Sequence, residues 1–217
     1  MKRIVCFLGA ALFGMATLIS CDDNGNGNEG GGNGGGDGTG GNDSTAMVVR
    51  TMTALDVSAY DQWVYVSFAD GQTVTQHYES PAPENWDIAL HRENVKTNNG
   101  SAIKTDVTSF EALTTIPSGS VFMKDELTYE EVSVDMSQMM QGIIVYDTTE
   151  INMVLEDWVM RSGMPPVYTV QPNVYVVKTE AGQYAKIQFT SYKGGETGDA
   201  NGYATFTYGF PFLPVEE

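Results

Sequence analysis

The stretch NVYVVKTEAGQYAKIQFTSY, residues 173–192, decides the fold class of this chain. It is rich in valine, tyrosine, isoleucine, phenylalanine and threonine, which favour β-strands. Glu180-Ala181-Gly182 provides a turn, so the residues on either side of it are predicted to form two antiparallel strands. After a predicted loop at 194–202, the run YATFTY at 203–208 returns as a third strand. The C-terminal part is therefore predicted to be an antiparallel meander within an all-β domain.

A second hairpin is predicted nearer the N-terminus. Gln62 to Ala69 (QWVYVSFA) alternates two sets of side chains, Asp70-Gly71 turns the chain, and Gln72 to Tyr78 (QTVTQHY) returns. Two period-two runs around Asp-Gly are a strong hairpin signal. Two further short strands are predicted at 47–55 and 86–91, and a turn at 98–100.

One segment departs from the strand pattern. Between Thr149 and Ser162, apolar side chains recur near helical spacing, which predicts a helix. Gly163 and Pro165-Pro166 would end that helix.

The N-terminus carries a lipoprotein signal. Lys2 and Arg3 precede an apolar run of about 16 residues, shorter than the roughly 20 residues of a membrane-spanning helix. The run ends in Leu18-Ile19-Ser20-Cys21, which resembles the lipobox of bacterial lipoproteins. Residues 1–20 are therefore predicted to be a signal peptide and Cys21 the lipidated residue, whose acyl chains anchor the protein.

A glycine-rich linker is predicted at residues 21–45, before a single domain at 46–217. Residues 24–42 contain 11 glycines among 19 residues and no apolar side chain to offset the entropy of ordering. The only cysteines are Cys6 and Cys21, so the mature domain has no disulfide and is held by packing.

The chain is strongly acidic, with a formal net charge of −17 that becomes two units more negative once Lys2 and Arg3 leave with the signal. Such a charge argues against nucleic acid and anionic lipid headgroups as partners. Contact with a membrane is predicted through the lipid anchor only. The acidic residues are scattered, which favours a solvated surface, with discrete calcium sites as the alternative.

Motifs for catalysis are weak, and the chain is predicted not to be an enzyme. Ser101-Ala102-Ile103-Lys104 matches S-x-x-K, but that motif needs a helix and two partner motifs, and both partners are missing. His77 and His91 are the only histidines, and neither setting suits a serine–histidine–aspartate triad. The sequence contains no phosphate loop, zinc spacing or dinucleotide fingerprint.

Two blocks of sequence resemble the HmuY-like haem-binding lipoproteins. The first is Trp86-Asp87-Ile88-Ala89-Leu90-His91-Arg92 followed by Thr97-Asn98-Asn99-Gly100-Ser101, where Asn99 stands in place of the second glycine of the family's turn. The second block comprises the strand sequences at 174–179, 184–192 and 202–208. The order and spacing of the blocks cover residues 46–210.

This resemblance implies an all-β, hand-shaped fold in which one antiparallel domain grips one haem between two finger-like loops, here at about residues 120–172. It also implies a role in iron acquisition. A lipoprotein anchored in the outer membrane, facing the cell surface or, as the alternative, the periplasm, would take haem from host haemoproteins and pass it to a TonB-dependent outer-membrane transporter. In some members the axial ligands are a pair of histidines, and in others a pair of methionines.

The placement of methionine favours the second kind of ligand pair. Six of the nine methionines that remain after signal removal fall within residues 136–164. A thioether is a soft, neutral sulfur donor and a known axial haem ligand. The preferred pair is Met140 with Met164, and the substitutes are Met139, Met136 and Met160. For each methionine the alternative is that it fills the core.

Neither histidine lies in the loop region at about residues 120–172. His91 belongs to the strand motif and is predicted to be structural, and His77 lies among polar residues of a hairpin strand. A pair of histidine ligands in the loop region is therefore excluded.

Two other interpretations remain open. The chain could be a lipid-anchored module that binds a glycan or a protein, with Trp63, Trp86 and Trp158 as candidate platforms. It could also keep the fold without binding haem, because a shared fold does not guarantee function.

Overall fold

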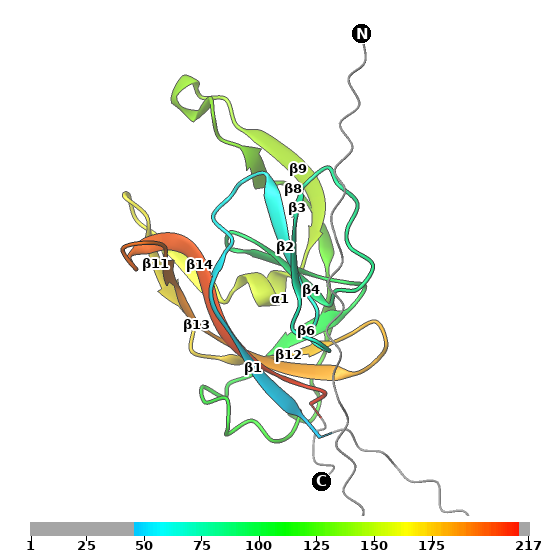
Figure 1. The fold of residues 1–217 in the computed structure, drawn as a ribbon. Helices are drawn as coiled ribbons and strands as arrows, with labels where there is room; N and C mark the ends of the chain where they lie inside the picture. Colours follow the sequence, from blue (N-terminus) through cyan, green and yellow to red (C-terminus); the bar gives the residue numbers. More distant parts are fainter. Residues whose placement is uncertain (1–45, 213–217) are drawn as a thin grey trace, which may run out of the picture. The chain divides into compact units, whose positions relative to one another are not determined.

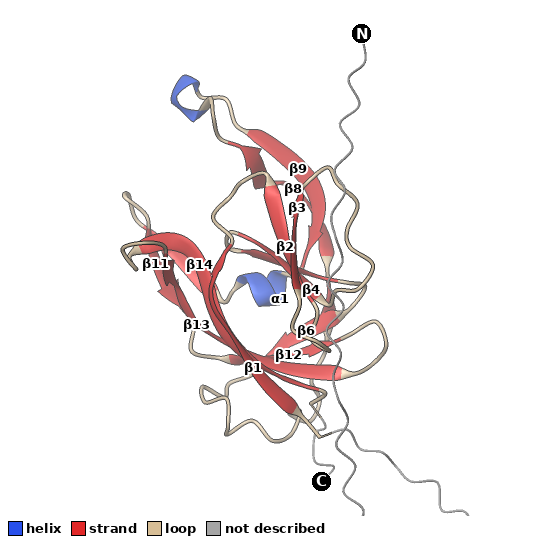
Figure 2. Ribbon diagram, viewed as in Figure 1, coloured by secondary structure: helices blue, strands red, loops and turns tan. Residues whose placement is uncertain are grey.

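The computed structural model describes residues 46–212, whose regular structure is almost entirely β-strand (Figures 1 and 2). The predicted signal peptide, the lipidation site at Cys21 and the linker lie outside the described residues. Two short helical turns occur in the described range: α1 at Met153–Glu156 and the 3-10 turn η1 at Met139–Gln141. The described range includes no helix long and apolar enough to cross a membrane. The predicted all-β class is confirmed.

The larger sheet has six strands in the order β1, β14, β13, β12, β6, β7. Their bounds are β1 Val48–Asp56, β14 Ala200–Phe210, β13 Tyr184–Gly194, β12 Val174–Lys178, β6 Ser101–Lys104 and β7 Met123–Lys124. The predicted meander forms its centre, because β12 pairs antiparallel with β13 and β13 with β14. β13 and β14 are longer than predicted and reduce the loop predicted at 194–202 to residues 195–199.

The second sheet has four strands in the order β3, β2, β4, β5. Their bounds are β2 Gln62–Val66, β3 Thr73–His77, β4 Ile88–His91 and β5 Asn94–Thr97. The predicted hairpin around Asp70-Gly71 is confirmed, with Val66 opposite Thr73. Gly71 has a positive φ of 76° and donates its N–H to the Ser67 carbonyl oxygen at 3.0 Å, which closes the loop.

The main core fills the space between these two sheets. In β2, Val64 and Val66 face this core, while Trp63 and Tyr65 face the opposite side and pack against β8 and β9. β12 is likewise buried on both faces. The alternation seen in the sequence is therefore between two buried faces rather than between core and solvent.

Two hairpins form separate two-stranded sheets. One consists of β8 (Glu126–Asp135) and β9 (Val145–Ile151), with η1 in its connection. The other consists of β10 (Val159–Ser162) and β11 (Val167–Val170). Figure 1 shows the free ends of both hairpins reaching beyond the two larger sheets. Both lie within residues 120–172, where the finger-like loops were expected.

The helix predicted over residues 149–162 is wrong, apart from the single turn of α1. Its first residues belong to β9 and its last four form β10. Asn152 begins the turn, because its side-chain oxygen accepts a hydrogen bond from the Leu155 N–H at 3.1 Å. Trp158 then donates from Nε1 to the Glu93 carbonyl oxygen at 2.8 Å. The apolar spacing is satisfied by a strand, a turn and a strand, which bury the same side chains against different neighbours.

The turn at 98–100 tolerates the substitution of asparagine for glycine. Asn99 adopts a φ of 51°, in the left-handed region that asparagine enters more readily than most residues. Gly100 is more restricted, since a Cβ there would lie 2.6 Å from the Lys178 carbonyl oxygen. The family-like turn is therefore retained.

Candidate functional site

A cleft of about 700 Å³ lies between the two hairpins, in the volume range of small-molecule and cofactor sites. One wall is formed by the end of β8 and the connection from β8 to β9, and the other wall by the β10–β11 hairpin. The turn between β4 and β5 forms the floor. The lining side chains are Tyr60, His91, Arg92, Glu93, Asn94, Ser133, Met136, Met139, Glu156, Val159, Arg161, Met164, Pro166, Tyr168 and Asn201.

Two predicted ligands line the β8 side of this cleft. Met139 begins η1 and donates its N–H to the Met136 carbonyl oxygen at 3.1 Å. Side chains three residues apart eclipse one another in a 3-10 turn, so Met136 and Met139 share a side. Met140 is 89% exposed and is not part of the lining. The structure therefore brings Met136 and Met139 to the cleft and leaves Met140 outside it.

The opposite wall follows the two-residue period of a strand. Val159 and Arg161 of β10 face the cleft, and Met160 between them, 53% exposed, faces away. Met164, at the free end of the hairpin, lines the cleft and is 90% exposed. Of the five predicted methionines, Met136, Met139 and Met164 are thus brought together.

The floor of the cleft is held by buried polar contacts. His91 is 1% exposed, and its Nε2 lies 2.6 Å from the Tyr60 carbonyl oxygen. Its ring also packs on Trp63, with ring centroids 5.1 Å apart. Burial lowers the pKa of His91 below its ordinary value. These contacts agree with the predicted structural role of His91.

Sequence reasoning missed Arg92 and Glu93, the two residues between β4 and β5. Arg92 adopts a φ of 52° and donates from Nη1 to the Ser58 carbonyl oxygen at 2.8 Å. Glu93 Oε2 accepts the hydroxyl of Tyr192 at 3.2 Å, and burial raises the pKa of that tyrosine. Its place in the sequence could have pointed to Arg92, because this residue directly follows the strand motif that ends at His91.

The other histidine is exposed on β3, as predicted. The ring nitrogen Nδ1 of His77 accepts a hydrogen bond from the Glu79 N–H at 3.3 Å. His77 lines a neighbouring hollow of about 510 Å³, and Tyr60 and Met136 line both this hollow and the cleft. Among residues 46–128 and 132–212, no group of three or more histidine, cysteine or acidic side chains is placed to hold a metal ion.

Strand geometry also argues against the S-x-x-K match. Ser101 and Lys104 are the two ends of β6, and an odd separation of three residues places their side chains on opposite faces. Ser101 is buried, whereas Lys104 is exposed and pairs with Asp157.

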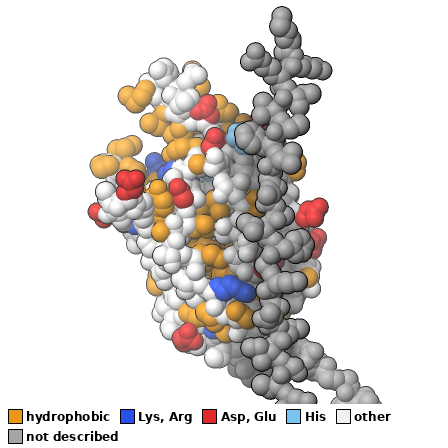
Figure 3. Space-filling model, viewed as in Figure 1, with side chains coloured by type: hydrophobic (Ala, Val, Ile, Leu, Met, Phe, Trp, Pro, Cys, Tyr) orange, Lys and Arg blue, Asp and Glu red, His pale blue; other side chains and the backbone are white. Residues whose placement is uncertain are grey.

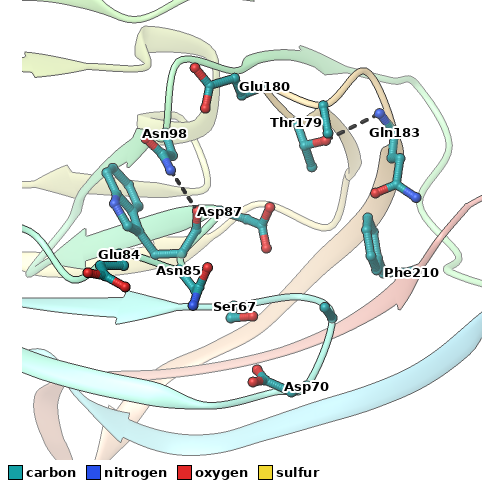
Figure 4. A pocket seen from close by; sticks show the side chains of 13 residues that line it. Ser67, Asp70, Glu84, Asn85, Asp87, Asn98, Thr179, Glu180, Gln183 and Phe210 are labelled. Carbon is teal, nitrogen blue, oxygen red and sulfur yellow. Dashed lines mark hydrogen bonds between the residues drawn. The ribbon is translucent and has the colours of Figure 1, made fainter.

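A second pocket, of about 390 Å³, lies beside the turn at 98–100 (Figure 4). It is lined by Trp86, Asp87 and Phe210, with Phe210 across the pocket from Asp87. Burial raises the pKa of Asp87, whose Oδ2 accepts the Phe68 N–H at 2.7 Å. Trp63 and Trp158 are buried in the core, so the prediction that they form surface platforms is wrong. Trp86 is half-buried and is the one candidate platform left.

Comparison with known proteins identifies relatives of the whole described domain. Residues 59–208 match the sequence profile of a protein family that is described as HmuY protein. A search of the curated proteins found no match.

Three solved structures have the same fold over nearly their whole length. A protein of Bacteroides vulgatus named as HmuY-like and haem-binding is 34% identical, with 78% of this chain and 94% of that chain covered at a TM-score of 0.69. A protein of Bacteroides fragilis named as a lipoprotein is 30% identical, with 79% and 93% covered and a TM-score of 0.69. The apo HmuY analogue of Tannerella forsythia is 28% identical, with 77% and 97% covered and a TM-score of 0.68.

Proposed function

This chain belongs to the HmuY family, and from that premise we propose that it binds haem in the cleft between its two hairpins. The observation that carries the proposal is the presence of thioether side chains from both hairpins in one cleft: Met136 and Met139 from one wall and Met164 from the other. Val159, Pro166 and the rings of Tyr60 and Tyr168 supply the apolar and aromatic surface that a porphyrin requires.

The exposure of these methionines supports a binding role over core filling. Met139 is 49% exposed and Met164 is 90% exposed, so neither contributes much buried area to the fold. Figure 3 shows hydrophobic side chains exposed at the ends of both hairpins. Exposed apolar side chains concentrated around one cleft are typical of a binding site.

We assign the axial pair to Met164 and Met139, with Met136 as the substitute for Met139. The lining of the cleft supports Met139 over Met140, which was preferred from the sequence. Thioether sulfur is neutral and soft, so this pair should favour ferrous over ferric iron more than imidazole does. Haem binding should therefore tighten on reduction.

The proposal extends to the cellular role as a haem carrier rather than an enzyme. Cys21 would anchor the protein in the outer membrane, at the cell surface, with the glycine-rich linker as a tether. The protein would accept haem from host haemoproteins and pass it to a TonB-dependent outer-membrane transporter. The lipobox sequence supports the anchor, as does the naming of the Bacteroides fragilis relative as a lipoprotein.

Absorbance titration with haem, in the oxidised state and after reduction, tests the site. We expect a Soret band that sharpens on reduction. Met139→Ala and Met164→Ala should weaken binding and change the reduced spectrum. Met140→Ala, a change in the neighbouring methionine outside the cleft, is the matched control and should leave both unchanged.

Two results would contradict this assignment in different ways. An unchanged spectrum at micromolar haem in both oxidation states would reject haem binding altogether. If Met140→Ala abolishes the spectrum while Met139→Ala does not, haem binds but the preferred pair from the sequence is the correct one.

Glycan binding by the same fold is the alternative function. Its support is the pocket beside Trp86, where amide and carboxylate groups surround a half-buried aromatic ring. Saturation of that pocket by a glycan, with no response to haem, would favour it.

A further inference from the structure

Two arginines line the cleft, and one of them is fully engaged by the fold. Arg92 donates from Nη1 to the Ser58 carbonyl oxygen at 2.8 Å, and its Nε lies 3.4 Å from Glu93 Oε2. Its guanidinium also stands 4.2 Å from the ring centroid of Tyr60. These contacts hold Arg92 in the floor as a structural cation.

The two carboxylates of the cleft also have partners. Glu93 accepts the Tyr192 hydroxyl at 3.2 Å, besides its contact with Arg92. Glu156 accepts a hydrogen bond from Asn94 Nδ2 at 2.6 Å. The charges of the floor are therefore largely compensated within the protein.

Arg161 differs from this set. It is exposed on β10 and makes no hydrogen bond or ion pair with the side chains that the structure describes, those of residues 46–128 and 132–212. The strand period points it into the cleft beside Val159, and Tyr168 lies directly opposite it on β11.

We propose that Arg161 binds a propionate carboxylate of haem and selects dianionic porphyrins over uncharged ones. A guanidinium presents paired donors that match a carboxylate, and its five donors here have no protein acceptor among the described residues. The surrounding protein is strongly acidic, so a single available cation in the cleft offsets repulsion of a dianionic ligand. The inference rests on the proposed function, and it gives the β10–β11 hairpin two roles: Met164 for iron and Arg161 for the propionate.

The test compares haem with haem dimethyl ester, in which both propionates are uncharged, under identical co-solvent and in the reduced state. The wild type should bind haem about tenfold more tightly than the ester, because the ester loses the charge-assisted hydrogen bond between carboxylate and guanidinium. Arg161→Gln should reduce this preference to about twofold or less while keeping the affinity for the ester. Lys124→Gln removes an exposed cation outside the cleft and should keep the preference.

Several results would contradict the proposed role of Arg161. Binding of haem and ester by the wild type with equal affinity, or an Arg161→Gln variant that keeps the preference, rejects the role of Arg161 alone. Equal weakening of both ligands by Arg161→Gln also rejects it, because a change in the scaffold would act on both. If the wild type binds neither ligand, the proposed function fails, and this inference with it. Arg161→Lys should retain part of the preference, since lysine supplies charge without the paired donors.

Discussion

The two larger sheets and the free ends of the two hairpins use apolar side chains in opposite ways. Between the sheets, residues such as Trp158, Phe189 and Phe206 are almost completely buried, and their rings contact one another. At the free ends of the hairpins, Met139 is about half exposed and Met164 is almost fully exposed. Buried apolar area stabilises the fold, whereas exposed apolar area does not. The difference indicates that the sheets provide a stable frame and that the hairpins present side chains to a ligand.

Polar groups show the same division. Lys186 is buried, and its Nζ donates to the carbonyl oxygens of Phe110 and Leu113 at 2.8 and 3.0 Å. Arg161, on a hairpin, has no such acceptor among the described residues. Lys186 in the frame and Arg92 in the floor of the cleft are therefore satisfied by the protein, whereas Arg161 on the β10–β11 wall is available to a ligand.

The largest effect expected from this comparison is on the frame. Trp158→Ala should lower the free energy of unfolding by about 3–5 kcal/mol, because it leaves a cavity and removes the hydrogen bond to the Glu93 carbonyl oxygen. Met164→Ala should change it by less than about 0.5 kcal/mol. Denaturant unfolding of both variants measures this difference. Similar losses of unfolding free energy in the two variants would contradict the distinction between frame and hairpin ends.

The next effect concerns the buried lysine. Lys186→Met should lower the free energy of unfolding by about 1–3 kcal/mol, because two buried carbonyl oxygens lose their donor. Lys124→Met, at an exposed position, is the matched control and should have little effect. Haem affinity should be the same in both variants. A change in affinity for Lys186→Met alone would mean that frame and cleft are coupled.

An effect of about 1.4 kcal/mol or more is expected at the cleft. The double variant Met139→Ala with Met164→Ala should weaken reduced-haem binding at least about tenfold while leaving thermal unfolding unchanged. The comparison predicts this separation because both side chains are exposed. A double variant that keeps the wild-type spectrum and affinity would remove the ligand role from these methionines.

The smallest expected effect is on pH dependence. Burial lowers the pKa of His91, so the folded state binds a proton less readily than the unfolded state, where the pKa is about 6.5. The contribution of His91 to stability is therefore present above that pH and is lost as the pH falls towards 5. His91→Gln should flatten the dependence of unfolding on pH between 7 and 5, as measured by denaturant unfolding at several pH values.

Haem binding should behave differently over the same range. Thioethers do not titrate, so the affinity for reduced haem should stay nearly constant from pH 5 to 8. Loss of affinity below pH 6.5 that disappears in a histidine variant would identify a histidine ligand instead.

Much of the frame could be predicted because its signal is local. Strands β2, β12, β13 and β14 follow from period-two runs of β-branched and aromatic residues between turn residues. The helix predicted at 149–162 failed because apolar spacing alone does not say which neighbours bury each side chain. Strand pairing between β10 and β11 and the hydrogen bond of Trp158 decided that segment.

The sequence by itself determined the all-β class, the region in which the methionines gather and the absence of histidine from that region. Only the tertiary structure decided which side chains meet in the cleft. The direction of a 3-10 turn brings Met139 to the cleft and leaves Met140 outside it. The pleat of a strand likewise points Arg161 into the cleft and Met160 away from it. The physical reason is that composition and period depend on neighbours along the chain, whereas a cleft between two hairpins depends on backbone orientation, which a change of one residue reverses.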